Sequence, residues 1–344
     1  MSVRVVYRDP AGGGFGYHPV FHMVRLAAEC LGGELVRLPR RNVGYLEKLF
    51  AILSRRQRTG PDVCLIVCAS PADLDSLLSL DLWKFKYARI VPWIFDSFWV
   101  DEAPIFTRFS RHFDHVFVTE PEDVVQWRRQ LSASVTCLPW GSDVLRLGSN
   151  NANRDIDLLR VGRQPSDWED DARTKVACGR RGIAFQGRPE RKEDATENQR
   201  FLTHTMGRAK FSLSFSNAVS PSIQTHPTRE YITGRWLDAV ASGTIVAGVA
   251  PKTELVDSVL WPEALLELTT TDLSKGLDVI EEALASWSPD RAALNHLRSL
   301  ERLDWRWRFE TIANVLGIRC NVLDSELSAL RTKIDDEVQI IHNT

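Results

Sequence analysis

Two acidic residues in the C-terminal half are spaced to suit an extended polar ligand. Glu230 and Asp238 are separated by seven residues, within a stretch whose apolar periodicity predicts a helix over 229–242. If the whole interval is helical, a rise of about 1.5 Å per residue places the two carboxylates ~12 Å apart. Carboxylates accept hydrogen bonds from sugar diols, and helix N-terminal amides bind phosphate. Periodicity alone describes equally well an amphipathic helix with two exposed acids.

A glycine-rich segment, Asp9–His18, follows the first expected strand and opens the first expected helix. Glycines let the backbone approach a ligand closely. An acceptor-binding or phosphate-binding loop is therefore predicted, with the residues Gly13, Gly14, Phe15, Gly16, Tyr17 and His18. The glycine spacing does not fit G-x-G-x-x-G, which disfavours dinucleotide binding of that kind. A plain turn is the alternative.

The elements that must position these residues alternate between strands and helices. Strands are expected at 2–8, 34–39, 62–70, 88–96, 115–120 and 134–141, and again at 155–162, 182–187, 211–216, 244–250 and 265–268. Helices are expected at 20–31, 46–58, 167–181, 198–209, 229–242 and 273–286, and from 290 onward, with a charged tail past Cys320. Short β-rich strands separated by helices are typical of parallel, doubly wound sheets, which bind ligands at the carboxyl ends of their strands.

The strand–helix alternation stops at the small, polar segment 148–153 and then restarts. This break predicts a linker between two Rossmann-like halves. The expected domains are 1–148 and 154–303, followed by a helical segment, 304–344, that ends in a tail.

Composition narrows the class of protein. The chain has 344 residues, 44% of them hydrophobic and 26% charged, with a net charge of −2, which argues against broad binding to nucleic acid. No apolar run approaches the ~20 residues of a membrane-spanning helix, and no signal-peptide pattern opens the chain, so a cytoplasmic protein is expected. Of six cysteines only Cys64 and Cys68 are close together, and no further ligands group near them, so no metal site is expected.

The segment from Glu230 to Gly248 resembles the donor-binding signature of glycosyltransferase family 4, the group 1 transferases, including their CgeB-like relatives. In that family two acids separated by seven positions precede a run of small residues and Gly-Thr-x-Val. Glu230 and Asp238 fit the two acids, the second shortened from Glu to Asp, and Ala239–Val246 fits the run.

Two further segments agree in order. Leu138–Asp143 looks like the family's segment that closes the N-terminal domain, and Leu159–Arg163 looks like the strand and Gly-Arg that open the donor domain. The resemblance implies an α/β fold of GT-B type, in which two Rossmann-like, doubly wound domains face a central cleft. It implies that domain 1–148 binds an acceptor, that domain 154–303 binds the nucleotide-linked donor, and that the segment 304–344 crosses back to the first domain. It also implies sugar transfer from a nucleotide sugar, UDP- or GDP-linked, with retention of configuration and without metal or cofactor.

The resemblance assigns roles to individual residues. Gly162 and Arg163 would contact the donor diphosphate, Glu230 the transferred sugar and Asp238 the ribose. The family lysine that follows Gly-Arg is absent from 164–171, so Arg188 and Arg229 are candidates for a second phosphate cation. The family histidine of the N-terminal domain is also absent, and Asp96 alone stands at that strand end. The predicted catalytic residues are therefore Glu230, Arg163 and Asp96.

Two other functions share this architecture. One is a sugar-nucleotide epimerase or phosphorylase, and the other is a catalytically idle module that binds a nucleotide sugar or a glycan. The expected acceptor is a glycan or a lipid-linked sugar.

A run of basic residues lies in the N-terminal half. It is either a solvated face or a peripheral contact with anionic lipid headgroups. Its members are Arg40, Arg41, Lys48, Arg55, Arg56 and Arg58.

Overall fold

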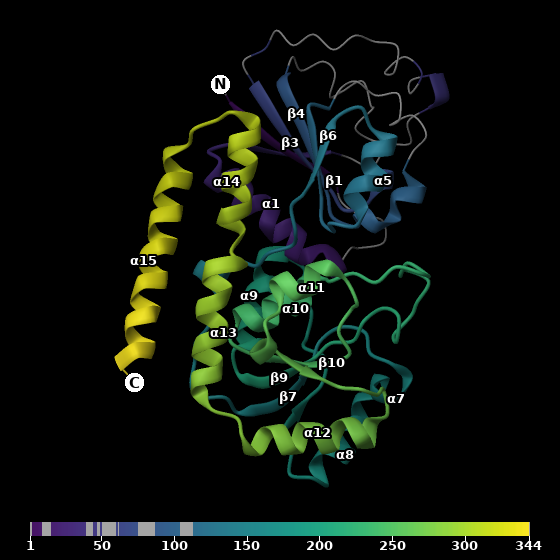
Figure 1. Cartoon of the computed structure of the whole chain (residues 1–344), viewed down its shortest axis with the longest axis vertical. Helices are drawn as coiled ribbons and strands as arrows, with labels where there is room; N and C mark the ends of the chain where they lie inside the picture. Colours follow the sequence, from purple (N-terminus) through teal and green to yellow (C-terminus); the bar gives the residue numbers. More distant parts are fainter. Residues whose placement is uncertain are drawn as a thin grey trace. The chain divides into compact units, whose positions relative to one another are not determined.

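The computed structural model describes residues 2–8, 15–38, 44–46, 49, 60, 62–74, 87–103 and 113–343 (Figure 1). The chain separates into two compact units. Unit 1 consists of Met1–Pro139 and Arg306–Leu327, and unit 2 of Trp140–Trp305 and Ser328–Thr344. No helix in the described ranges has an apolar stretch long enough to cross a membrane.

Unit 1 is built on a six-stranded parallel sheet with the order β2-β1-β3-β4-β5-β6. Its strands are β1 (Val3–Arg8), β2 (Glu34–Leu38), β3 (Asp62–Cys68), β4 (Tyr87–Ile94), β5 (His115–Val118) and β6 (Ser134–Cys137). Its helices include α1 (His18–Cys30) and α5 (Asp123–Gln130). The central strands β3 and β4 are almost wholly buried, which explains their continuous apolar runs.

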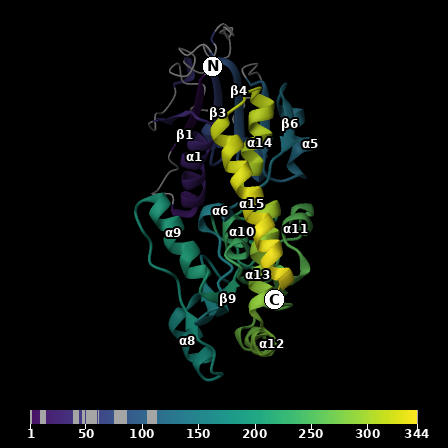
Figure 2. The ribbon, with the colours of Figure 1, turned by 90° about the vertical axis from the view of Figure 1, so that its left-hand side faces the viewer.

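Unit 2 has a five-stranded sheet with the order β11-β10-β9-β7-β8, again with only parallel pairs. Its strands are β7 (Ile156–Arg160), β8 (Phe185–Gln186), β9 (Ala209–Leu213), β10 (Ile245–Gly248) and β11 (Leu265–Glu267). Its helices are α6 (Val144–Leu147), α7 (Ser166–Glu169), α8 (Asp171–Gly179), α9 (Ala195–Met206), α10 (Gly234–Ala241), α11 (Glu254–Val259), α12 (Leu273–Ala285) and α13 (Pro289–Arg302). Helices α10 and α13 lie side by side (Figures 1 and 2).

The core of unit 2 forms around the buried faces of β7, β9 and β10. Trp168, Phe211 and Phe215 are fully buried there, together with Leu277 and Ile280 of α12. Gly248, the last residue of β10, packs its backbone directly against the backbone of Ser214. Only glycine fits there, because a Cβ on residue 248 would lie 1.6 Å from the Ser214 carbonyl oxygen. The strand ends are thereby held close together at the carboxyl edge of the sheet.

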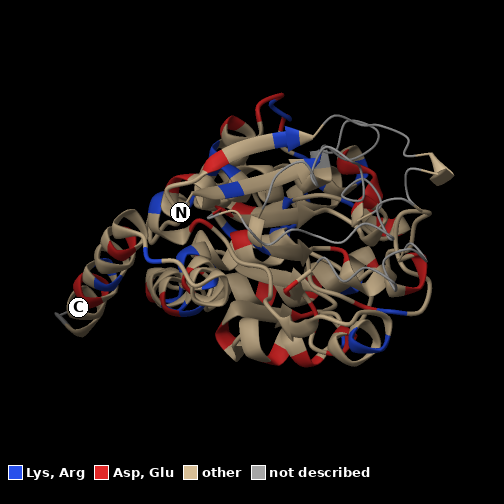
Figure 3. Ribbon diagram, turned by 90° about the horizontal axis from the view of Figure 1, so that it is seen from above, with Lys and Arg blue, Asp and Glu red and all other residues tan. Residues whose placement is uncertain are grey.

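Two helices follow at the end of the chain, α14 (Trp305–Leu316) and α15 (Asn321–Asn343). The charged tail predicted past Cys320 is instead a long helix that carries both acidic and basic side chains (Figure 3). Lys333 and Glu337, one turn apart, form an ion pair of 2.7 Å. Glu337 also accepts hydrogen bonds from Asn150, which fixes the last turns of α15 on unit 2.

Several expected helix boundaries are wrong, because side-chain caps set them. Helix α9 begins at Ala195 and not at 198, since Asp194 caps the amides of Thr196 and Glu197. The helix predicted over 167–181 is broken at Asp170, which ends α7 and caps α8. The helix predicted over 229–242 begins only at Gly234, and α11 was not predicted at all. The helix predicted over 46–58 lies almost wholly outside the described residues.

Candidate functional site

Glu230 lies at the carboxyl edge of the unit 2 sheet, in the extended segment before α10 and not on the helix itself. Ser216, just past β9, donates its hydroxyl to the Glu230 carboxylate. The backbone amide of Lys252, just past β10, also points at this carboxylate, at 3.3 Å. The half-buried Glu230 is thus fixed by residues from two strand ends, where parallel sheets bind ligands. The expected 12 Å helical spacing to Asp238 therefore does not apply.

Arg163 follows β7 and lies against the loop that connects β9 to α10. Its Nε donates to the Ser220 carbonyl oxygen at 2.8 Å, and its Nη1 donates to the Ser222 hydroxyl at 2.8 Å. No carboxylate within the described ranges pairs with its guanidinium. One loop therefore contacts both predicted donor-binding groups, Arg163 through Ser220 and Ser222, and Glu230 through Ser216.

The same loop is closed on itself. Asn217 donates to the carbonyl oxygens of His226 and Arg229, at 3.2 and 2.7 Å. The ring Nδ1 of His226 accepts from the backbone amides of Thr228 and Arg229, at 3.2 and 3.1 Å. His226 is therefore a structural cap that orients the segment leading into Glu230.

Arg235, in the first turn of α10, is a candidate site residue that was not predicted from the sequence. Its Nη1 donates to the Arg163 carbonyl oxygen at 3.1 Å, and its Nη2 donates to the Phe215 carbonyl oxygen at 2.9 Å. A basic residue at a helix N-terminus opposes the helix dipole, and this was the available signal. The structure thus places a second arginine directly beside Arg163.

Asp238 is only 1% exposed, which corrects the interpretation of two exposed acids on one helix. Its Oδ1 accepts from the Ser142 hydroxyl at 2.6 Å and its Oδ2 from the Gln199 amide at 2.8 Å. Both carboxylate oxygens are thus engaged inside unit 2. In this geometry Asp238 ties α10 to its neighbours and offers no free face to a ribose.

The other two cations predicted for the donor differ in their surroundings. Arg188 forms an ion pair with Glu169 at 2.9 Å, and its backbone amide donates to Asp171. Glu169 and Asp171 also pair with the buried Arg160, so this cluster joins β7 to α7 and α8.

The backbone of Arg229 is held by His226 and Asn217. No hydrogen bond or ion pair joins Arg188 to Arg163 or Glu230 in the described structure.

In unit 1, Asp96 stands just past β4, where its backbone amide donates to the Ala69 carbonyl oxygen at 2.9 Å. Tyr17, in the 3-10 turn that opens α1, donates its hydroxyl to the Asp96 carboxylate. The structure therefore brings together one residue of the predicted loop and the predicted acid of the N-terminal domain. Burial raises the pKa of Asp96 to about 7, although the Tyr17 hydrogen bond opposes the shift.

The other residues of the predicted Asp9–His18 loop add no support for a binding role. Gly13 and Gly14 lie outside the described residues, as does the side chain of Phe15. A methyl group at Gly16 would meet nothing within 4 Å, so no close approach requires glycine there. His18 is 5% exposed and lies 6.5 Å from the ring of Phe21, within α1. The basic run at 40–58 also falls outside the described residues.

The raised pKa of Asp96 predicts that unfolding depends on pH. Because the folded-state pKa of Asp96 exceeds the unfolded one, the folded state binds the extra proton. The contribution of this carboxyl to stability is therefore fully present below pH ~4 and is lost as pH rises through about 7. We expect the free energy of unfolding of wild type to fall by about 1–2 kcal/mol between pH 5.5 and 8 because of Asp96, and we expect this fall to be absent in Asp96→Asn. Urea unfolding of wild type and variant at both pH values measures this difference, and parallel pH profiles would contradict it.

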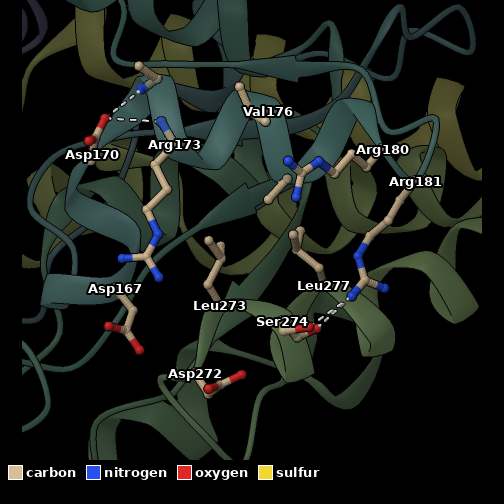
Figure 4. A pocket seen from close by; sticks show the side chains of 12 residues that line it. Asp167, Asp170, Arg173, Val176, Arg180, Arg181, Asp272, Leu273, Ser274 and Leu277 are labelled. Atoms are coloured by element: carbon tan, nitrogen blue, oxygen red, sulfur yellow. Dashed lines mark hydrogen bonds between the residues drawn. The ribbon is translucent and has the colours of Figure 1, made fainter.

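A groove of about 840 Å³ lies on unit 2 between α8 and α12 (Figure 4). Val176, Leu273 and Leu277 form its apolar floor, and Arg181 at one end donates to Ser274. None of the predicted donor-binding residues lines this groove. Within the described part of the chain, no three histidine, cysteine or acidic side chains are grouped as metal ligands.

Comparison with solved structures identifies the fold. Sucrose-phosphate synthase from Thermosynechococcus elongatus superposes with a TM-score of 0.54 at 12% identity, covering 92% of this chain and 98% of that one. HepE from Anabaena, in complex with UDP-glucose, superposes with a TM-score of 0.53 at 10% identity, covering 91% of this chain and 99% of that one. The apo form of the lipopolysaccharide outer core galactosyltransferase WaaB gives 0.50 at 12% identity, covering 92% and 99%.

No protein-family model matches the sequence, and neither does any curated protein. At 10–12% identity the structural likeness shows the fold, and it extends over nearly the whole of each chain. Together with the two parallel sheets, it confirms the predicted α/β fold class of GT-B type.

Proposed function

We propose that this chain is a glycosyltransferase that binds a nucleotide sugar, UDP- or GDP-linked, at the carboxyl edge of the unit 2 sheet. The observation that carries the proposal is that Glu230, Arg163 and Arg235 all contact the segment that follows β9, through Ser216, Ser220 and Phe215 respectively. Neither arginine pairs with a carboxylate in the described structure. Carboxylates accept hydrogen bonds from sugar hydroxyls, and arginines bind phosphate oxygens. The three side chains therefore fit the two chemically distinct ends of a sugar diphosphate.

The structural neighbours support this donor class. HepE was solved with UDP-glucose, and WaaB is described as a galactosyltransferase. In the proposed reaction, Arg163 stabilises the negative charge that develops on the departing diphosphate, because a fixed cation needs no reorganisation as the bond breaks. Glu230 orients the transferred sugar through its hydroxyls. Asp238 supports α10 from within and does not touch the donor.

Unit 1 is proposed to bind the acceptor, a glycan or a lipid-linked sugar. Asp96 and Tyr17 are the residues we assign to it, since a carboxyl with a pKa of about 7 accepts or donates a proton near neutral pH. Retention of anomeric configuration follows from the resemblance to family 4 and forms part of the proposal. The anomeric coupling of the first-formed product, read by proton NMR, distinguishes retention from inversion.

A thermal-shift screen of UDP-, GDP-, ADP- and dTDP-sugars tests the proposal. A donor at one hundred times its dissociation constant stabilises the folded chain by about 2.7 kcal/mol. We expect one nucleotide class to raise the melting temperature of wild type by several degrees, and Arg163→Ala to abolish this shift. Absence of a shift with every donor, in folded wild type, would overturn the proposal.

Arg208 provides a matched control for that variant. It lies at the opposite, amino edge of the same sheet and forms an ion pair with Asp155. We expect Arg208→Ala to keep the full donor-dependent shift. Loss of the shift in both variants would mean that arginine removal weakens unit 2 in general.

A further inference from the structure

The guanidinium of Arg235 has more hydrogen-bond donors than partners. Of its five N–H groups, two are engaged, by the carbonyl oxygens of Arg163 and Phe215. Its Nε is inaccessible to solvent and has no partner in the described structure. The Nε of the structural Arg160 is in the same state, so the buried Nε alone does not point to a ligand. One further N–H group on each of Nη1 and Nη2 has no partner in the described structure, and these two are available to an acceptor.

The chain is built to admit this side chain. Gly162 has a φ of +73°, a conformation that non-glycine residues rarely adopt. A Cβ at Gly162 would lie 2.7 Å from the Nη1 of Arg235. The turn after β7 thus favours glycine for its backbone conformation, and the guanidinium of Arg235 passes directly beside it. The pairing of Gly162–Arg163 with Arg235 is a specific feature of the local structure.

Arg163 and Arg235 form a concentration of positive charge without compensation. Other arginines of unit 2 pair with carboxylates in the described structure, among them Arg160, Arg181, Arg188, Arg208 and Arg298. No carboxylate lies within ion-pair distance of Arg163 or Arg235 in the described residues, and the N-terminus of α10 adds its positive dipole. Burial, and then the charge of Arg163, lowers the pKa of Arg235 to about 10, so it is still a cation at neutral pH.

Arg154 shows how a purely structural arginine differs. It is 8% exposed and also has no carboxylate partner in the described structure. Its three nitrogens are nevertheless all satisfied, by acceptors that include Asn151, Ala209 and Ser242. Arg154 therefore joins separate backbone segments, whereas three N–H groups of Arg235 have no acceptor in the described structure.

We propose that Arg235 is the second cation of the diphosphate site, where it and Arg163 bind different phosphates of a nucleoside diphosphate. This inference rests on the proposed function and names the residue that replaces the lysine absent after Gly162–Arg163. Gln164, the next residue, is buried and donates to Val161 and Leu213, so it does not supply the cation. Arg235 fits the role because its unused donors lie beside Arg163.

Calorimetric titration with UDP and UMP, or with GDP and GMP where the donor screen selects guanine, tests the assignment. We expect Arg235→Gln to weaken binding of the diphosphate about thirtyfold and of the monophosphate less than threefold. Arg235→Lys should recover at least half of the lost affinity on a logarithmic scale, because one cation is restored. The ratio of the two affinities is the decisive quantity, since a structural role would move both equally.

Arg154→Lys is the matched control, because it changes a buried arginine of the same unit. We expect it to lower the melting temperature but to leave the diphosphate-to-monophosphate ratio within twofold of wild type. Equal weakening of both nucleotides by Arg235→Gln and Arg235→Lys, or no weakening by either, would overturn the assignment. Wild type that binds neither UDP nor GDP would instead overturn the proposed function itself.

Discussion

Replacing Glu230 with glutamine is expected to reduce kcat for sugar transfer about a hundredfold, which corresponds to about 2.7 kcal/mol of lost transition-state stabilisation. The carboxylate is fixed by Ser216 and by the amide of Lys252, so its orientation is set before the donor arrives. Glutamine keeps the size of the side chain and one acceptor oxygen but removes the charge. Steady-state kinetics with the donor selected by the screen measures the loss.

Glu263→Gln is the control for this effect. Glu263 belongs to unit 2 but pairs with Arg298 on the surface, at 2.6 Å. We expect the control to keep wild-type kcat. Glu230→Gln should keep the wild-type melting temperature within ~2 °C, since glutamine keeps the size of the side chain and an oxygen that accepts from Ser216. More than half of wild-type activity in Glu230→Gln would contradict a role for this carboxylate in transfer.

Replacing Asp238 with alanine is expected to destabilise unit 2 by about 2–4 kcal/mol, because it leaves the buried Ser142 hydroxyl and Gln199 amide without their acceptor. For a unit of this size the melting temperature should fall by about 5–10 °C. Asp238→Asn should cost less, since its amide oxygen still accepts from Ser142. Differential scanning calorimetry compares the three proteins.

A role for Asp238 in donor binding would give a different result from a structural role. If Asp238 contacts a ribose, alanine at this position should weaken donor binding tenfold or more while the melting temperature of the unliganded protein stays unchanged. The structure predicts the reverse pattern, with a large loss of stability and a donor affinity close to wild type in the fraction that stays folded.

The strands and the fold class were predictable because burial in a parallel sheet leaves a direct trace in sequence. β3 and β10 are continuous apolar runs, and Gly162 and Gly243 mark turns whose positive φ favours glycine. The resemblance to family 4 pointed to Glu230 and Arg163 as donor-binding residues, and that assignment stays a prediction. These features are local, so a few consecutive residues specify each of them.

The wrong predictions depend on contacts between residues distant in sequence. Asp238 is buried by Ser142 and Gln199, which are 96 and 39 positions away, and no local pattern reveals that. Glu230 lies outside the helix because its segment is tied to Ser216 and Lys252. Arg235 was overlooked because helical periodicity describes which face is apolar, not which cations lack a counter-charge.

Hydrogen exchange with and without the nucleotide sugar that gives the largest thermal shift tests the central claim most directly. Donor binding at Arg163, Arg235 and Glu230 should slow amide exchange at least threefold in peptides covering 160–164 and 213–236. Peptides covering 172–181 and 273–277, which line the groove between α8 and α12, should not change. Slowing confined to that groove, or none at saturating donor, would contradict a donor site at the carboxyl edge of the unit 2 sheet.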